Sequence, residues 1–257
     1  MLAASDRRNP TACFSGQKAN PRATMRLFCL PYAGGGASIY RGWEQSLPAG
    51  VDVWPVQPPG RGSRYREKPY ESFEALVSDV ARAMRPFMDL PFCLFGHSLG
   101  ALVSFELAHR LREEHDVEPQ HLFVSGCRGP QFPRGGPTNI HHLPDDEFIT
   151  KLRELNGTPR EVLDNPDLIQ VMMETLRADF KLAETYVCSA DTRLSCPITA
   201  LGGSEDDEAP QEDVEGWREQ TTGPFDFWML PGDHFFLHSS EQMVLRILTQ
   251  QLKRLRP

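Results

Sequence analysis

The sequence predicts an α/β fold: a mostly parallel central sheet, helices on both faces and a helical lid insertion. Short apolar runs alternate with amphipathic helical patterns along most of the 257 residues, which is typical of a parallel sheet covered on both faces. A serine flanked by glycines joins one of these runs to the next helix. The alternation stops between residues 128 and 190, where only helical patterns occur. These observations predict an N-terminal arm (1–24), a core (25–127 and 191–257) and a lid (128–190).

Two strands and a helix are expected before the strand that leads into the serine motif. Met25–Leu30 is an almost continuous apolar run, expected as a buried strand that ends in a glycine-rich loop, Gly34–Gly36. Val51–Val56 is a second strand candidate. Pro55 argues against a central position for this strand, because proline lacks the N–H that a central strand donates to its neighbour. Apolar residues at helical spacing then mark an amphipathic helix: Phe73, Leu76, Val77, Val80, Met84 and Phe87.

Ser98 is the predicted nucleophile. The apolar run Phe92–Phe95 leads directly into Gly96-His97-Ser98-Leu99-Gly100, and a helical pattern follows. Such a strand–turn–helix holds the serine in a strained backbone conformation, so the residues two before and two after it must be small. Gly96 and Gly100 meet this requirement. The strand before the motif and the helix after it favour this interpretation over a chance pentapeptide in a loop.

The glycine-rich loop after the first strand is interpreted as part of an oxyanion hole. It lacks the lysine of a phosphate-binding P-loop, and Ile39 stands where a dinucleotide-binding fingerprint needs glycine. A serine hydrolase needs two backbone N–H groups for the oxyanion, one after the nucleophile and one from such a loop. We assign these donors to Leu99 and Ala33. A flexible turn without a catalytic role is the alternative.

His234 is the predicted general base. It follows the last predicted strand, Phe225–Leu230, which is where a serine hydrolase with this strand–helix order carries its histidine. His97 adjoins Ser98, but the turn is expected to direct its side chain away. His238 is the second candidate, one turn farther along the chain.

The acid that orients this histidine should follow the preceding strand, Pro197–Leu201. The loop after that strand contains four carboxylates: Glu205, Asp206, Asp207 and Glu208. Spacing alone leaves Asp206 and Asp207 as close alternatives, since both are short acids just past the turn. Asp233 is too close to His234 in sequence to reach Nδ1 of its neighbour, and it is expected to shape the loop.

Two helices are expected in the lid, beginning near Pro144 and Pro166, where acidic residues suit the first helical turn. An insertion between core strands would lie over the strand ends, beside the serine. Met172, Met173 and Phe180 belong to the second helix. They either line an acyl pocket or pack the lid against the body, and the pattern does not separate these alternatives.

The composition argues against several classes of function. The formal charge of −8 and the lack of a long basic run argue against nucleic-acid binding. No apolar run approaches the roughly 20 residues of a membrane helix, and we see no secretory signal. The six cysteines have no C-x-x-C spacing and are expected to be reduced, in a cytoplasmic protein. No metal or cofactor is expected, and His141-His142 is interpreted as a solvent-exposed pair.

The chain resembles the type II thioesterases, the stand-alone editing hydrolases of polyketide, nonribosomal peptide and fatty acid synthases. The similarity extends from about residue 25 to the C-terminus, and six motifs carry it: Pro31–Gly35, Gln57–Arg61, Gly96–Gly100, Leu155–Pro159, Arg177–Asp179 and Leu230–Phe236. The resemblance implies the α/β-hydrolase fold. It also implies an acid in a Gly-x-x-Asp turn, which Gly203–Asp206 matches, so Asp206 is preferred over Asp207.

The resemblance further implies thioester hydrolysis by the predicted triad, without a cofactor. The implied partner is an acyl- or peptidyl-carrier protein, whose phosphopantetheine arm presents stalled or aberrant acyl groups to a monomeric enzyme. A general carboxylesterase or acyltransferase with the same triad is one alternative. A non-catalytic carrier-binding module is another, which the intact triad argues against. Arg61, Arg64 and Arg66 are a hypothetical docking patch for an acidic carrier, although Arg61 and Arg64 suit a structural role equally well.

Overall fold

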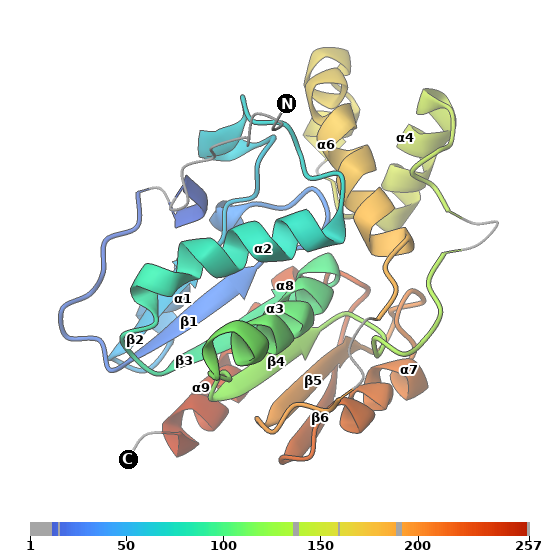
Figure 1. Cartoon of the computed structure of the whole chain (residues 1–257). Helices are drawn as coiled ribbons and strands as arrows, with labels where there is room; N and C mark the ends of the chain where they lie inside the picture. Colours follow the sequence, from blue (N-terminus) through green and yellow to red (C-terminus); the bar gives the residue numbers. More distant parts are fainter. Residues whose placement is uncertain (1–11, 15, 136–138, 159, 189–191, 256–257) are drawn as a thin grey trace.

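The computed structural model describes residues 12–14, 16–135, 139–158, 160–188 and 192–255, and the six strands in these residues form one parallel sheet (Figure 1). Their spatial order is β2-β1-β3-β4-β5-β6, and every neighbouring pair is parallel. The strands are β1 (Met25–Leu30), β2 (Val51–Pro55), β3 (Phe92–His97), β4 (His121–Ser125), β5 (Ile198–Gly203) and β6 (Phe225–Leu230). The predicted α/β fold with a parallel sheet is confirmed.

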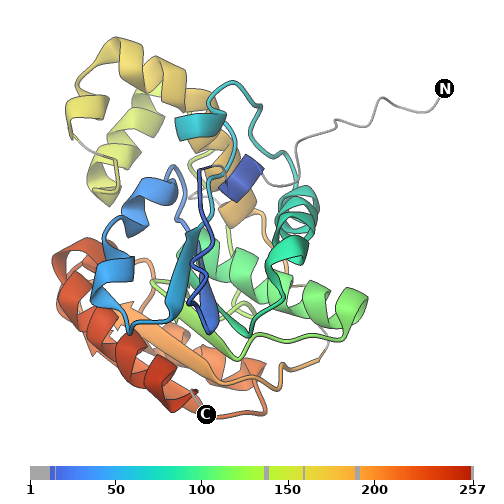
Figure 2. The ribbon, with the colours of Figure 1, turned by 90° about the vertical axis from the view of Figure 1, so that its left-hand side faces the viewer.

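Helices cover both faces of the sheet, as predicted (Figure 2). One face carries α2 (Phe73–Met84) and α3 (Leu99–His115), and the opposite face carries α9 (Glu241–Arg254). No helix of the described residues is long and apolar enough to cross a bilayer. The shorter elements are α1 (Trp43–Ser46), α7 (Gln211–Glu215), α8 (Phe236–Ser239), η1 (Ala12–Phe14), η2 (Ala37–Tyr40), η3 (Gly62–Arg64), η4 (Arg85–Phe87) and η5 (Gly216–Gln220).

Alternate residues of the central strands point to the two faces of the sheet. Phe28 and Leu30 of β1 pack in the cluster that contains α2 and α3, whereas Leu27 and Cys29 pack in the cluster that contains α9. All four side chains are at most 2% exposed. A strand buried on both faces needs apolar residues at consecutive positions, which explains why the strand sequences are continuous apolar runs.

Pro55 ends β2, which is an edge strand. Among the described strands β2 pairs with β1 alone. The next residue, Val56, donates its N–H to the carbonyl oxygen of Cys29 at 2.8 Å. Proline is tolerated here because an edge strand leaves one side of its backbone unpaired. The inference from Pro55 that this strand does not lie in the centre of the sheet is therefore confirmed.

Cys13 and Phe14 of the predicted N-terminal arm pack against the core. They are only 4% and 5% exposed, and the centroid of the Phe14 ring lies 5.4 Å from that of Trp54 in β2. Gln57 donates its N–H to the carbonyl oxygen of Cys13 at 2.8 Å. Burial of the apolar aromatic side chain of Phe14 attaches this part of the arm to the edge strand β2. Residues 1–11 and 15 of the predicted arm lie outside the described residues.

The lid contains α4 (Asp145–Leu155), α5 (Arg160–Leu163) and α6 (Pro166–Glu184), of which α5 was not expected. These helices bury an apolar cluster of their own, separate from the two clusters of the sheet. Figure 1 shows α4 and α6 beyond the end of the sheet toward which the β1 arrow points. The predicted boundary at residues 190 and 191 lies outside the described residues.

The interpretation of His141 and His142 as a solvent-exposed pair is wrong for His141. Its Nδ1 atom lies 2.5 Å from Glu184 Oε2, and its side chain is 20% exposed. Glu184 also accepts the N–H of Ile140 at 2.7 Å. The carboxylate therefore holds the segment before α4 against the end of α6, which sequence spacing does not reveal. His142 is exposed, as expected.

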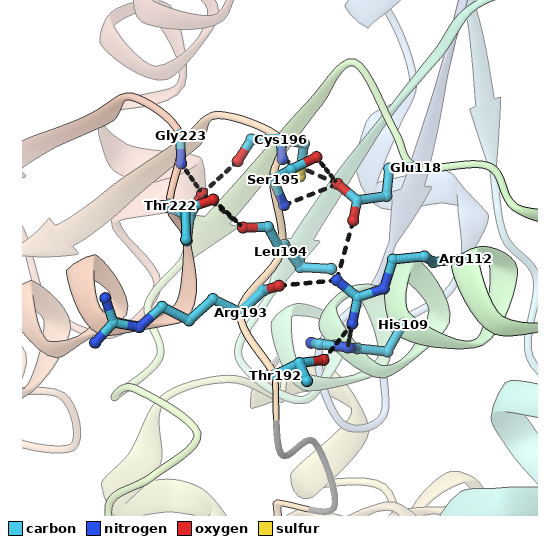
Figure 3. A network of polar contacts seen from close by, with 11 residues as sticks. His109, Arg112, Glu118, Thr192, Arg193, Leu194, Ser195, Cys196, Thr222 and Gly223 are labelled. Carbon is cyan, nitrogen blue, oxygen red and sulfur yellow. Dashed lines mark hydrogen bonds and ion pairs between the residues drawn. The ribbon is translucent and has the colours of Figure 1, made fainter.

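A polar network fixes the chain where it returns from the lid to the core (Figure 3). Glu118, just after α3, accepts the N–H groups of Ser195 at 2.9 Å and Cys196 at 3.0 Å. Arg112 of α3 donates to Glu118 at 3.1 Å and to the carbonyl oxygen of Arg193 at 2.8 Å. The segment before β5 is thereby attached to the helix that begins directly after Ser98.

Candidate active site

Ser98 occupies a sharp turn between β3 and α3. Its backbone dihedral angles are φ 53° and ψ −118°, a conformation that residues other than glycine rarely adopt. A Cβ atom on Gly96 would lie 2.0 Å from the carbonyl oxygen of Gly100, and one on Gly100 would lie 2.1 Å from that of Leu30. Only glycine fits at both positions, so the predicted need for small residues around the serine is confirmed.

Asp206 holds His234. The Nδ1 atom of His234 lies 2.9 Å from Asp206 Oδ2, and the Asp206 side chain is 0% exposed. The second carboxylate oxygen, Oδ1, accepts the N–H groups of Glu208 at 2.9 Å and Ala209 at 3.2 Å. Asp207 is exposed. Of the two alternatives that the spacing left open, the structure brings Asp206 to the histidine.

This contact decides which nitrogen of His234 is free. An ionised carboxylate only accepts hydrogen bonds, so Asp206 selects the tautomer with the proton on Nδ1 and leaves Nε2 able to take a proton. Among the described residues no hydrogen bond joins Ser98 Oγ to His234. Such bonds often tighten only when substrate binds.

His97 supports the loop of His234, a role that the sequence did not reveal. Its Nε2 lies 2.9 Å from the carbonyl oxygen of His234, and its Nδ1 lies 2.9 Å from Ser125 Oγ. Because a carbonyl oxygen only accepts, Nε2 donates to it and the Ser125 hydroxyl donates to Nδ1. Burial lowers the pKa of His97 well below its usual range, which keeps the ring neutral. In the sequence, only the position of His97 inside the serine motif pointed to a role of this histidine in the site.

His238 and Asp233, which follow the same strand as His234, form hydrogen bonds of their own. His238, the second candidate for the base, has its Nε2 atom 2.9 Å from the hydroxyl of Tyr32. Asp233 accepts the N–H of Phe235 at 2.9 Å, so it shapes the loop, as expected.

The two predicted oxyanion donors have no acceptor within the described part of the chain. Leu99 is the first residue of α3, where N–H groups lack partners inside the helix and lie at the positive end of its dipole. Ala33 lies in a turn that the N–H of Gly35 closes by donating to Tyr32 O at 2.9 Å. Both N–H groups are therefore without an acceptor among the described residues, and their role as the oxyanion hole stays a proposal.

An apolar cavity lies beside the serine turn. Its walls come from the ends of β1 and β2, from α2 and α3, and from the lid, and they include Val56, Leu76, Val80, Leu99, Val103 and Asp179. Met172, Met173 and Phe180 do not line it. They pack in the apolar cluster of the lid itself, where the Phe180 and Phe148 ring centroids are 5.8 Å apart. An acyl-lining role for these three residues therefore has no support in this structure.

Arg61 and Arg64 are structural, so the suggested docking patch is wrong for these two residues. Arg61 Nη1 lies 2.7 Å from Asp179 Oδ2, and the Arg61 side chain is 11% exposed. Arg64 pairs with Glu67 at 2.6 Å, and its side chain is 4% exposed. Among the three, only Arg66 is exposed.

Comparison with known proteins identifies the family of this chain. A family model described as thioesterase domain matches residues 25–252. The solved structure of the type II thioesterase BorB, from the borrelidin biosynthetic cluster, is 34% identical with a TM-score of 0.81, and the match covers 93% of this chain and 94% of BorB. The chain belongs to the type II thioesterase family.

Two curated relatives are similar to this thioesterase over most of its length. The gramicidin S biosynthesis protein GrsT of Aneurinibacillus migulanus is 42% identical over 240 residues, 93% of each chain. The protein named linear gramicidin dehydrogenase LgrE, of Brevibacillus parabrevis, is 42% identical over 248 residues, 95% of this chain and 94% of LgrE. A dehydrogenase name does not suit the residues of this thioesterase, because Ile39 replaces a glycine that the dinucleotide-binding fingerprint requires.

Proposed function

We propose that this thioesterase works through Ser98 as nucleophile, His234 as general base and Asp206 as the acid that orients the base. The observation that carries the proposal is the 2.9 Å hydrogen bond between His234 Nδ1 and Asp206 Oδ2. This bond leaves His234 Nε2 to take the proton of the serine hydroxyl. The strained turn at Ser98 supports the same assignment, as does the N–H of Leu99, which has no acceptor in the described part of the chain.

The proposed reaction has two halves. Ser98 Oγ attacks the thioester carbonyl carbon while His234 Nε2 takes the hydroxyl proton, and the N–H groups of Leu99 and Ala33 stabilise the oxyanion. The C–S bond then breaks, the thiolate leaves with the proton from the imidazolium, and the acyl group remains as an ester of Ser98. Water attacks this ester as His234 takes its proton. The acid leaves, and the proton returns to Ser98, while Asp206 stabilises the imidazolium throughout.

The proposed substrate is an acyl group on the phosphopantetheine arm of a carrier protein. The names of GrsT and BorB refer to gramicidin S biosynthesis and to the borrelidin cluster, which supports a role in nonribosomal peptide or polyketide synthesis. Removal of stalled or aberrant acyl groups is the proposed task, performed by a monomer in the cytoplasm. Such hydrolysis needs no metal or redox cofactor, because the serine, the histidine and the oxyanion donors supply the chemistry.

One acyl group presented in three ways tests the proposal: on a holo carrier protein, on coenzyme A and as a simple oxygen ester. We expect the carrier-bound thioester to be preferred, and Ser98→Ala to lower kcat by at least about 10³-fold. Equal or better turnover of the oxygen ester would instead favour a general carboxylesterase. Binding of the carrier without hydrolysis would favour a non-catalytic module. Near wild-type turnover by Ser98→Ala would contradict the mechanism.

A further inference from the structure

Asp179 of the lid contacts the loop that carries the proposed oxyanion donor Ala33. Its Oδ2 atom accepts the N–H of Gly34, the residue after Ala33, at 2.8 Å. The same oxygen lies 2.7 Å from Arg61 Nη1. Asp179 is 5% exposed. One buried carboxylate therefore connects α6 to two loops of the core beside the serine.

The loop of Ala33 has a geometry that this acceptor can hold. The turn is closed by the hydrogen bond from Gly35 N–H to Tyr32 O at 2.9 Å, and its third residue, Gly34, has φ 78°. A positive φ at this position is typical of a type II turn, which differs from a type I turn in the orientation of its central peptide. By accepting the N–H of Gly34, Asp179 holds the peptide between Ala33 and Gly34 in one of these orientations. This fixes the backbone conformation of Ala33, whose own N–H belongs to the preceding peptide.

The lid also packs against this loop. A Cβ atom on Gly34 would lie 2.5 Å from Leu176 Cδ2, so the Leu176 side chain of the lid helix packs directly on this glycine. Leu176 and Asp179 are three residues apart and share one face of α6. Thr175 donates its hydroxyl to the carbonyl oxygen of Gly60 at 3.1 Å, so it attaches the same helix to a different loop.

We infer that Asp179 is a positioning residue for thioester hydrolysis. Its carboxylate holds the loop so that the N–H of Ala33 points to the oxyanion, and Arg61 fixes the carboxylate. The inference rests on the proposed function, because it requires Ala33 to be an oxyanion donor. Since Asp179 belongs to the lid, this donor is correctly oriented only while α6 lies against the core.

Three variants test this role: Asp179→Ala, Asp179→Asn and, as the matched control, Thr175→Val. The control removes a lid-to-core hydrogen bond of the same helix without touching the Ala33 loop. The turnover of an acyl-N-acetylcysteamine thioester gives kcat and KM. Two ligands distinguish binding of the oxyanion from binding of the ground state. Ser98 Oγ adds to the carbonyl carbon of an alkyl trifluoromethyl ketone and forms an oxyanion, whereas an alkyl thioether, which lacks the carbonyl, binds only as a ground-state analogue.

Asp179→Ala should lower kcat by about 10- to 100-fold and weaken binding of the trifluoromethyl ketone by about the same factor. KM and the Kd of the thioether should stay within about threefold, because ground-state binding does not use the oxyanion donor. Asp179→Asn keeps an oxygen that accepts the N–H of Gly34, so its kcat should exceed that of Asp179→Ala by at least about threefold. Thr175→Val should stay within about threefold of wild type in every measurement.

Unchanged binding of the ketone by Asp179→Ala, or an equal loss for the ketone and the thioether, would overturn the inference and leave Asp179 as an anchor of the lid. If Asp179→Ala does not fold, Asp179→Leu, which has a similar shape but no acceptor for the N–H of Gly34, is compared with Thr175→Val, and equal kcat and ketone affinity in these two variants would overturn it. Near wild-type turnover by Ser98→Ala would instead contradict the proposed function, so the two failures are distinguishable.

Discussion

Asp206 uses both of its carboxylate oxygens. Oδ2 faces Nδ1 of His234, and Oδ1 accepts the N–H groups of Glu208 and Ala209. These bonds fix the carboxylate in a site with no access to solvent, where an unpaired charge would be costly. Asp207, one residue further, is exposed. Two neighbouring acids of the same chemistry therefore have different environments.

Asparagine at these two positions should separate their roles. Asp206→Asn should lower kcat by about 10³- to 10⁴-fold, because the amide no longer favours the proton on Nδ1 and no longer stabilises the imidazolium. Asp207→Asn is the matched control and should stay within about threefold of wild type. Steady-state kinetics on a carrier-bound or coenzyme A thioester measures both. A larger loss in Asp207→Asn would assign the acid to that residue.

At the scale of elements, the connection from the lid back to β5 depends on Glu118. Its carboxylate accepts from Ser195, Cys196 and Arg112 (Figure 3). Burial by itself would raise the pKa of Glu118, but the hydrogen bonds from Ser195, Arg112 and Cys196 outweigh it and lower the pKa below its usual range. The carboxylate is therefore ionised at neutral pH, and each bond to it is charge-assisted.

Removal of this carboxylate should destabilise the fold without affecting the chemistry. We expect Glu118→Ala to lower the free energy of unfolding by about 2 kcal/mol, since it leaves two backbone N–H groups without their acceptor and removes one acceptor of Arg112. Urea unfolding measures the change, with Glu113→Ala, an exposed position of α3, as the control. The kcat should stay within about twofold. An equal stability for the two variants would show that the network contributes nothing.

For the molecule as a whole, buried histidines such as His109 and His121 make stability depend on pH. His109 and His121 are each 4% exposed, and Nε2 of His121 lies 2.8 Å from the hydroxyl of Thr199. Burial lowers the pKa of each imidazole from 6.5 to about 4. Between these values the unfolded chain binds more protons than the folded protein, so the free energy of unfolding falls as the pH falls from 6.5 toward 4.

His121→Gln should reduce this acid sensitivity. In the wild type, protonation of the unfolded chain at His121 should cost about 3 kcal/mol of stability over the full shift. The variant should lose less stability across that pH window, because glutamine does not titrate. Urea unfolding at a series of pH values measures the slope, and His142→Gln, at an exposed position, is the control. Parallel pH profiles for the wild type and His121→Gln would contradict the assignment.

Sequence patterns predicted those features that depend on neighbours along the chain. The runs at Met25–Leu30 and Phe92–Phe95 correspond to β1 and β3, and the serine turn lies between β3 and α3. Pro55 correctly indicated that β2 does not lie in the centre of the sheet. These features are local, because strand periodicity, the lack of a proline N–H and the need for small residues around Ser98 act within a few positions.

Other features needed the packed chain. Spacing left Asp206 and Asp207 equivalent, and burial of one separated them. The sequence left docking and structural roles open for Arg61, and its pairing with Asp179 of the lid favours the structural role. Met173 is buried in the cluster of the lid rather than along the cavity. Each of these outcomes depends on which side chains, distant in sequence, fill the same space.

The sequence by itself determined the α/β fold, the turn that presents Ser98 and the thioesterase family, because each is encoded in short motifs and periodic patterns. Only the tertiary structure decided that Asp206 reaches His234 and that Asp179 reaches the loop of Ala33. Both contacts join segments that folding brings together, where distance and desolvation decide which polar group finds a partner.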